Sequence, residues 1–293
     1  MLPDRFRSLY PFPSHFLNLG GLRYHYLDEG AGEALVLLHG NPSWSLYYRA
    51  LVQALRPAYR AVVPDHIGMG LSDKPGDTEY SYTLQRRVED LEALLKHLGL
   101  EKDLTLVLHD WGGMIGMAYA ARHPEAIRRL VVLNTSAFRL PETKPFPWQL
   151  WLTRTPLGAL LVRGCNAFSR AASRACVRRK PMPPLLREAY AFPYDSWRNR
   201  IATLRFVQDI PLRPGDKSFG LVLETEQALA RFRRLPMLIC WGMRDFVFDF
   251  HFLEGWTARF PEAEVHRFED CGHYILEDAA EELIPAIREF LLK

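Results

Sequence analysis

One aspartate stands where a buried strand turns directly into a helix, a position that suits a nucleophile. The apolar run 104–108 leads into His109-Asp110-Trp111, and two glycines follow at once. So sharp a turn crowds the backbone, and small residues must flank its apex. The apex side chain then projects at the carboxyl end of the strand, where ligands bind in open α/β sheets. The alternative is that Asp110 only caps the following helix.

Two further candidates follow later strands. Asp245 comes just after the apolar run 236–241, and His273 lies between the strand-like run 264–268 and the last helical stretch. Each could be a capping or structural residue by itself. Together with Asp110, however, they follow the order nucleophile, acid, histidine that α/β-hydrolase enzymes use. In the serine version the turn reads G-x-S-x-G, and Leu108 breaks the first half of that spacing.

The elements that must position these residues alternate in type. A hairpin is expected around Gly20-Gly21, and apolar strands then alternate with amphipathic helices up to about residue 133. The stretch 138–231 has helical segments, many prolines and no strand alternation, and strand–helix alternation resumes after it. We expect an α/β fold of the α/β-hydrolase type, with a mostly parallel twisted sheet and helices on both faces. The expected organisation is core 1–137, helical cap 138–231 and core 232–293.

Composition narrows the class of protein. The chain has 293 residues and a formal charge of +3, too small to indicate nucleic-acid binding. Its four cysteines form no CxxC pair and no zinc-site spacing, so we expect no metal and reduced thiols in the cytoplasm. The N-terminus lacks the apolar stretch of a signal peptide, and no run approaches the ~18 apolar residues of a membrane span.

The inserted segment is unusually basic. Between Arg139 and Lys217 there are fifteen Lys or Arg and five Asp or Glu. The excess can be a solvated helical surface, a docking surface for an acidic partner, or a peripheral membrane contact. The cations that share the cap with the apolar segment 157–162 are Arg154, Arg163, Arg170, Arg174, Arg178, Arg179 and Lys180.

Three motifs resemble the haloalkane dehalogenases and their close relatives over essentially the whole chain. They are His39-Gly-Asn-Pro-Ser-Trp44, Asp65-His-Ile-Gly-Met-Gly-Leu-Ser-Asp73 and His109-Asp-Trp-Gly-Gly113. The resemblance implies that Asp110 attacks carbon and that the side-chain N–H groups of Asn41 and Trp111 hold the leaving group. It also implies that the backbone N–H groups of these two residues form an oxyanion hole. Leu108 departs from the serine pattern but agrees with this family.

Finer motifs in the core and in the cap resemble the β-lactone decarboxylases of bacterial long-chain olefin biosynthesis, and those in the cap set the chain apart from ordinary dehalogenases. Among them are Thr143-Lys-Pro-Phe-Pro-Trp148, Gly164-Cys-Asn-Ala-Phe-Ser169 and Pro193-Tyr-Asp-Ser-Trp-Arg-Asn-Arg200. The resemblance implies conversion of a cis-3,4-dialkyl β-lactone to a cis-alkene and carbon dioxide, without a cofactor and beside a β-lactone synthetase. We expect an apolar channel for the alkyl chains, lined by Phe138, Phe146, Trp148, Trp151, Leu160, Leu161, Phe168 and Trp197. The alternative is that these residues only pack the cap on the core.

Several alternatives stay open at this point. Asp110 can attack the ring carbon that bears oxygen or the lactone carbonyl, and His273 has no water to activate in a decarboxylation. A haloalkane dehalogenase is the second enzymatic candidate. An epoxide hydrolase would need paired cap tyrosines, for which Tyr190 and Tyr194 are the candidates. A non-catalytic lipid-binding relative is disfavoured because Asp110, Asp245 and His273 are all present.

Overall fold

The core of the molecule is an eight-stranded sheet. The computed structural model describes residues 2–293, with strands in the order β1-β2-β4-β3-β5-β6-β7-β8. The strands are β1 (His15–Leu19), β2 (Leu22–Glu29), β3 (Glu33–Leu38), β4 (Tyr59–Pro64), β5 (Leu104–Asp110), β6 (Ile127–Thr135), β7 (Met237–Gly242) and β8 (Glu264–Phe268). β2 is antiparallel to both of its neighbours. The remaining strands, in the order β4-β3-β5-β6-β7-β8, are parallel to one another. The expected fold class is thereby confirmed.

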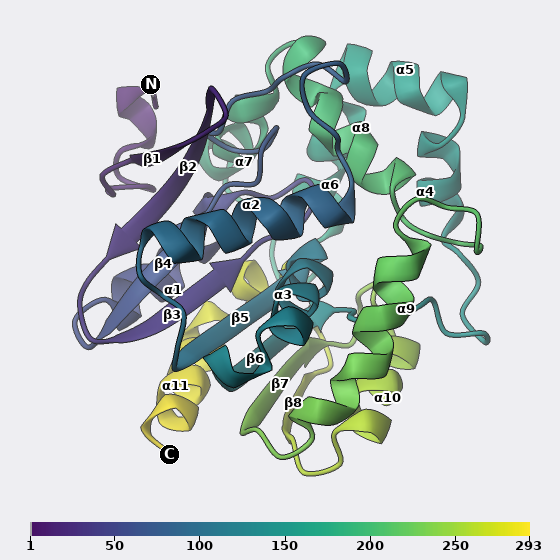
Figure 1. Ribbon diagram of the computed structural model, residues 1–293. Helices are drawn as coiled ribbons and strands as arrows, with labels where there is room; N and C mark the ends of the chain where they lie inside the picture. The colour runs from purple at the N-terminus through teal and green to yellow at the C-terminus, as the bar shows by residue number, and fades with distance from the viewer. Residues whose placement is uncertain (1) are drawn as a thin grey trace.

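Helices cover both faces of the sheet, as continuous apolar strands require. Side chains alternate along β3, so that Val36 and Leu38 belong to one apolar core and Leu35 and Leu37 to the other. In Figure 1, α2 and α3 lie in front of the sheet and α1 and α11 behind it. The core helices are α1 (Arg49–Leu55), α2 (Leu84–His97), α3 (Trp111–Arg122), α10 (Phe250–Arg259) and α11 (Ile275–Leu292).

A set of short helices is inserted between β6 and β7; most of them lie beyond one end of the sheet, whereas the last of them lies in front of it (Figure 1). They are α4 (Trp148–Thr153), α5 (Pro156–Cys165), α6 (Ala167–Ala175), α7 (Pro184–Ala191), α8 (Ile201–Gln208) and α9 (Phe219–Ala228). The last of these, α9, packs against α3 of the core. We therefore propose that the cap ends before α9, near residue 217, rather than at residue 231.

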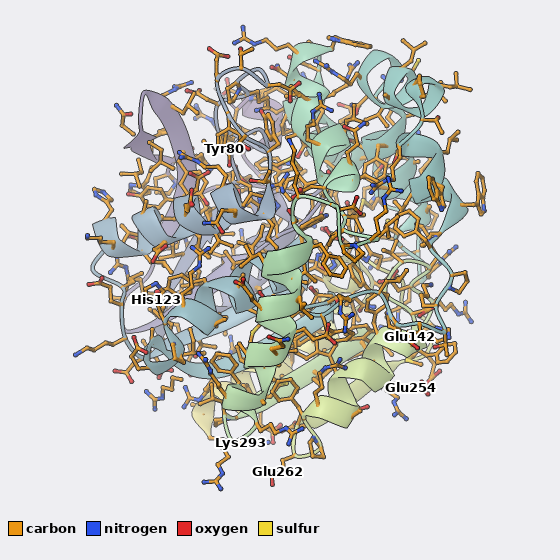
Figure 2. All side chains as sticks on the ribbon, turned by 45° about the vertical axis from the view of Figure 1, so that its right-hand side comes forward. Tyr80, His123, Glu142, Glu254, Glu262 and Lys293 are labelled. Carbon is orange, nitrogen blue, oxygen red and sulfur yellow. The ribbon has the colours of Figure 1, made fainter. Side chains whose placement is uncertain are left out.

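The outside of the molecule is largely polar. Glu254, Glu262 and Lys293 project outward from the core end, and Glu142 projects from the segment after β6 (Figure 2). No helix in residues 2–293 combines the length and the apolar character needed to cross a bilayer. Over the same residues, no group of three or more His, Cys, Asp or Glu side chains is arranged to hold a metal ion. Cys165 is exposed and the other three cysteines are buried, all as free thiols.

Candidate active site

Asp110 ends β5 and immediately precedes α3, at the expected sharp turn. Its backbone is left-handed, with φ +52°, a conformation that non-glycine residues rarely adopt outside strained functional turns. A Cβ on Gly112 would lie 1.9 Å from the carbonyl oxygen of Leu38, and one on Gly113 would lie 1.9 Å from the hydroxyl of Thr135. The two glycines are therefore required by close approach of the neighbouring strands, and they let the turn present the carboxylate at the strand end.

The Asp110 carboxylate is almost fully buried, with 7% of the residue exposed. Its Oδ1 accepts the backbone N–H of Asn41 at 2.5 Å, and the backbone N–H of Trp111 also donates to the carboxylate. Burial raises the pKa of Asp110 above its ordinary value, although His273 and the two backbone donors act in the opposite direction. These N–H groups therefore help to hold in place a carboxylate that is largely removed from water.

His273 connects Asp110 to Asp245. Its Nε2 is 3.6 Å from Asp110 Oδ2, and its Nδ1 donates to Asp245 Oδ2 at 2.8 Å. Burial alone would lower the pKa of His273, but Asp245, its hydrogen bond and Asp110 outweigh burial, so the pKa is raised. The imidazole therefore favours the cationic form between two carboxylates. The three residues predicted from strand ends are together, in the arrangement of nucleophile, base and orienting acid.

Two supporting residues were not singled out in the sequence. Asn134, at the end of β6, donates to Asp245 Oδ2 at 3.1 Å and joins β7 through Gly242. His109 donates from Nε2 to the carbonyl of His273 at 2.8 Å and stacks on Tyr47. Each is a polar residue at the carboxyl end of an apolar strand, and that signal could have identified both. Their contacts fix the orientation of the acid and of the histidine loop.

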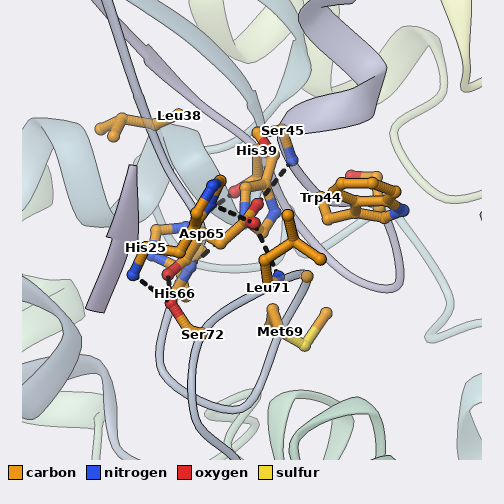
Figure 3. Close-up of polar contacts among 12 residues, drawn as sticks. His25, Leu38, His39, Trp44, Ser45, Asp65, His66, Met69, Leu71 and Ser72 are labelled. Atoms are coloured by element: carbon orange, nitrogen blue, oxygen red, sulfur yellow. Dashed lines mark hydrogen bonds and ion pairs between the residues drawn. The ribbon is translucent and has the colours of Figure 1, made fainter. Parts of the chain in front are cut away.

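The loop that carries Asn41 is held from behind by a buried polar cluster around Asp65 (Figure 3). The Asp65 carboxylate accepts the backbone N–H groups of Ser45 at 2.7 Å and Leu71 at 2.8 Å, and it lies 2.8 Å from His25 Nδ1. Burial would raise its pKa, but His25, His39 and these donors together lower the pKa to about 2. Asp65 is therefore ionised and ties the loop after β3 to the loop after β4.

A cavity of about 470 Å³ lies above Asp110, within the roughly 300–1,000 Å³ typical of small-molecule sites. Asn41, Asp110, Trp111 and His273 form its polar part, and most of the remaining lining is apolar. Among the predicted cap residues, Phe138, Phe146, Leu161 and Phe168 line it. These four residues therefore lie where an apolar substrate channel was expected, and their role in binding substrate stays a prediction.

The other predicted lining residues do not reach the cavity. Trp148, Trp151 and Trp197 are 70%, 55% and 49% exposed, and Leu160 is also exposed. In α4 the cavity is lined instead by Gln149, Leu150, Leu152 and Thr153, of which Leu150 and Thr153 are buried. α4 is a single short helix of six residues whose apolar side chains surround its axis, so sequence periodicity could not determine which of them face inward.

Two N–H donors face the cavity as candidate leaving-group holders. The indole N–H of Trp111 has no hydrogen-bond acceptor among residues 2–293, and Trp111 lines the cavity. The side-chain amide of Asn41 donates one hydrogen to the carbonyl of Thr203 in α8 at 3.0 Å, which leaves its second hydrogen for a ligand. The candidate epoxide-opening tyrosines are engaged elsewhere: Tyr190 donates to Glu277, and Tyr194 to the carbonyl of Ser43.

The chain can be compared with known protein families and solved structures. Residues 33–280 match the family model described as alpha/beta hydrolase fold, and the chain belongs to that family. The haloalkane dehalogenase DatA from Agrobacterium tumefaciens C58 superimposes with a TM-score of 0.84, covering 96% of each chain at 24% identity. That likeness shows the shared fold.

Proteins similar to the chain in sequence indicate a narrower group than the fold does. The chain is similar to a cis-3-alkyl-4-alkyloxetan-2-one decarboxylase from Shewanella oneidensis, 59% identical over 97% of this chain and 90% of the relative. An enzyme of the same name from Xanthomonas campestris pv. campestris is 52% identical, with 92% and 93% covered. A haloalkane dehalogenase from Mycolicibacterium paratuberculosis is 34% identical, with 97% and 95% covered. The resemblance seen in the cap motifs is confirmed.

Proposed function

We propose that the chain decarboxylates cis-3-alkyl-4-alkyloxetan-2-ones, which are cis-3,4-dialkyl β-lactones, to cis-alkenes and carbon dioxide. The observation that carries the proposal is near full-length identity of 59% and 52% to two enzymes of that name. The apolar cavity ending at a buried carboxylate is its structural support, because the reaction needs an apolar substrate brought to a desolvated nucleophile.

In the first step, Asp110 attacks the ring carbon that bears the ring oxygen. A new bond forms between the Asp110 oxygen and that carbon, the carbon–oxygen bond of the ring breaks, and the ring oxygen leaves as part of a free carboxylate. Ring strain supplies the electrophile, and holding the carboxylate dry and in line supplies the nucleophile. The product of this step is an aspartyl ester beta to a carboxylate.

In the second step, the bond between the neighbouring carbon and the carboxylate breaks and releases carbon dioxide. Its electron pair forms the double bond, and the ester carbon–oxygen bond breaks to return Asp110 as a carboxylate. Inversion in the first step followed by anti elimination in the second gives a cis-alkene from a cis-lactone. No water is consumed and no proton changes hands, so the scheme balances without a co-reactant.

The donor arrangement favours attack at the ring carbon over attack at the lactone carbonyl. Carbonyl attack develops an oxyanion that needs the backbone N–H groups of Asn41 and Trp111. Both of these groups donate to the Asp110 carboxylate itself. The N–H groups that remain for the substrate are those of the Trp111 indole and the Asn41 side-chain amide. These groups can donate to the departing carboxylate oxygen.

In this proposal, His273 and Asp245 favour the ionised form of Asp110. The raised pKa of His273, which results from Asp245 and Asp110 outweighing burial, favours an imidazolium ion 3.6 Å from Asp110. That cation opposes the effect of burial on Asp110 and so favours its ionised, nucleophilic form. The same cation stabilises Asp110 as it departs in the second step.

We also propose that the chain works in the cytoplasm beside the enzyme that forms the lactone ring, with the cap as docking surface. Free cysteines suit a reducing compartment. On the cap, the guanidinium groups of Arg154, Arg163 and Arg174 donate to backbone carbonyls rather than to carboxylates, so their charges are available to an acidic partner. Arg179 is unsuitable, because it pairs with Asp270 and Glu282 of the core.

The test is to supply the purified chain with a synthetic cis-3,4-dialkyl β-lactone and to analyse the products by gas chromatography and mass spectrometry. We expect the cis-alkene and carbon dioxide in equal amounts. Brominated and chlorinated alkanes of similar length serve as competing substrates. Release of halide with no alkene from the lactone would overturn the proposal in favour of a haloalkane dehalogenase.

A further inference from the structure

A buried arginine lies directly behind the Trp111 indole. The side chain of Arg87, on α2, is fully buried. Its guanidinium carbon lies 3.7 Å from the ring centre of Phe206 and 5.4 Å from that of Trp111. The two rings are themselves in edge contact, with centres 5.3 Å apart. The positive charge of Arg87 therefore lies against an aromatic pair of which one member, Trp111, lines the cavity.

The charge of Arg87 is only partly compensated. One nitrogen, Nη1, donates to Asp209 Oδ2 at 2.9 Å, while Nε and Nη2 have no partner within residues 2–293. The other oxygen of Asp209 accepts the hydroxyl of Ser218 at 2.7 Å. A buried guanidinium with two unused donors is costly if its only purpose is to join two elements. The arrangement leaves a positive field on the side of Trp111.

The same cap helix contacts both candidate leaving-group donors. Phe206 of α8 packs on Trp111, Thr203 of α8 accepts the side-chain amide of Asn41, and Asp209 follows the last turn of α8. Arg87 is thus the core residue that α8 holds in place, through Asp209 and Phe206. The core–cap contact and the anion-holding site are built from the same residues.

We propose that Arg87 is a positioning residue that strengthens Trp111 as an anion-binding donor. A cation over an indole ring draws electron density toward itself, which makes the indole N–H a stronger hydrogen-bond donor. In a site of low dielectric, its field also favours a negative charge that develops at that N–H. The inference rests on the proposed function in one respect, that Trp111 holds the carboxylate released from the lactone.

The experiment measures anion binding without turnover. The protein is labelled with ¹⁵N-tryptophan, which gives indole signals from its seven tryptophans, and Trp111→Phe identifies the Trp111 signal. Bromide is titrated at constant ionic strength, and the shift of that signal gives its dissociation constant. The variants are Arg87→Met, Arg87→Lys and Asp209→Asn. Arg49→Met is the matched control, because Arg49 also forms a buried pair with a carboxylate, Glu277, away from Trp111.

The electrostatic role predicts opposite effects from the two partners of one ion pair. Arg87→Met should weaken bromide binding roughly tenfold, the ratio that corresponds to about 1.4 kcal/mol. Arg87→Lys should retain most of the affinity. Asp209→Asn removes the opposing negative charge while keeping an acceptor for Arg87, so it should bind bromide more tightly than the parent protein. Arg49→Met should leave the dissociation constant unchanged.

A purely structural clamp predicts a different pattern. If Arg87→Met and Asp209→Asn weaken bromide binding alike, or if neither changes it, the proposal is overturned. Should Arg87→Met fail to fold, the sign of the Asp209→Asn effect decides by itself. Alkene formation measured on the same samples separates this result from the proposed function, because bromide binding at Trp111 requires no lactone chemistry.

Discussion

At the level of single residues, the site combines a desolvated carboxylate with N–H donors that can bind the negative charge of the leaving group. Asp110 is held by two backbone N–H groups in a left-handed turn, so its position is fixed before substrate enters. Trp111 lines the same cavity, and its indole N–H has no acceptor in the described part of the chain. Such preorganised donors act mainly on the transition state, where charge develops on the leaving oxygen.

Trp111→Phe should therefore reduce kcat far more than it raises KM. Losing one preorganised donor typically costs about 2.7–4 kcal/mol, a fall of about 10²–10³ in rate. Steady-state kinetics with a cis-β-lactone measures both constants. Trp148→Phe is the matched control, because Trp148 is 70% exposed and lies outside the cavity. Equal kcat values for the two variants would show that Trp111 does not hold the leaving group.

At the scale of elements, the loops after β3 and β4 are fixed by one ionised side chain. Asp65 accepts two backbone N–H groups and contacts His25, and its pKa is lowered to about 2 from an ordinary value of 3.8 by His25, His39 and the backbone donors, against burial. A carboxyl with a depressed folded-state pKa stabilises the protein above its unfolded pKa. That contribution is lost as the pH falls through the folded-state value.

Asp65→Asn should destabilise the protein by about 2–3 kcal/mol at neutral pH, because the folded-state pKa of Asp65 is lowered from 3.8 to about 2 and one pKa unit corresponds to about 1.4 kcal/mol. Denaturant unfolding of both proteins between pH 7 and acid conditions measures the difference. The difference should be constant down to about pH 4 and shrink between about pH 4 and about pH 2, as Asp65 of the parent protein takes up its proton. A difference independent of pH throughout would show that the charge of Asp65 does not stabilise the loops.

The sequence was informative where a residue's chemistry follows from its place at a strand end. Asp110, Asp245 and His273 each follow a strand of the parallel sheet, and parallel strands bring their carboxyl ends to one edge. Asn134 and His109 also stand at strand ends, but the groups they contact, Asp245 and the carbonyl of His273, are brought close only by the fold, so their roles could not be predicted from position alone. Trp148 and Trp151 were misplaced because α4 is a short helix that is apolar on more than one side.

The cavity passes between cap helices, so its length should set the range of alkyl chains. Each buried methylene stabilises a bound substrate by roughly 0.8 kcal/mol until the cavity is full. Val162 lines the cavity from α5, whereas Leu160 of the same helix is exposed. Val162→Trp should lower kcat/KM for long-chain lactones about tenfold or more while sparing short ones. Leu160→Trp should leave the chain-length profile unchanged, and a similar loss in both variants would contradict this cavity assignment.

At the scale of the whole molecule, charge is distributed unevenly. The cap carries the excess of arginine, and Arg170 and Arg174 are exposed on α6. Exposed charges act over a Debye length of about 10 Å at 0.1 M salt and about 3 Å at 1 M. An association through these residues should therefore be strong at low salt and weak at high salt, whereas the apolar cavity should be indifferent to salt.

Arg170→Glu with Arg174→Glu should reduce co-purification with the lactone-forming enzyme, and turnover of a short soluble lactone should stay the same. Pull-down at several salt concentrations measures the first, and a product assay measures the second. Arg233→Glu with Arg234→Glu is the control, because these exposed arginines lie on the core before β7. Association that survives the cap reversals, or that is lost equally in the control, would assign the basic cap a different role.

The proposed mechanism depends on conversion of a cis-β-lactone to a cis-alkene through a covalent ester on Asp110. Its most direct test is a single-turnover reaction of the parent protein and of Asp110→Asn with a cis-3,4-dialkyl β-lactone, followed by product analysis and intact-protein mass spectrometry. Cis-alkene is expected from the parent protein, and neither alkene nor adduct is expected from a folded Asp110→Asn protein. Alkene formation by Asp110→Asn at more than a few per cent of the parent rate would contradict this role of Asp110.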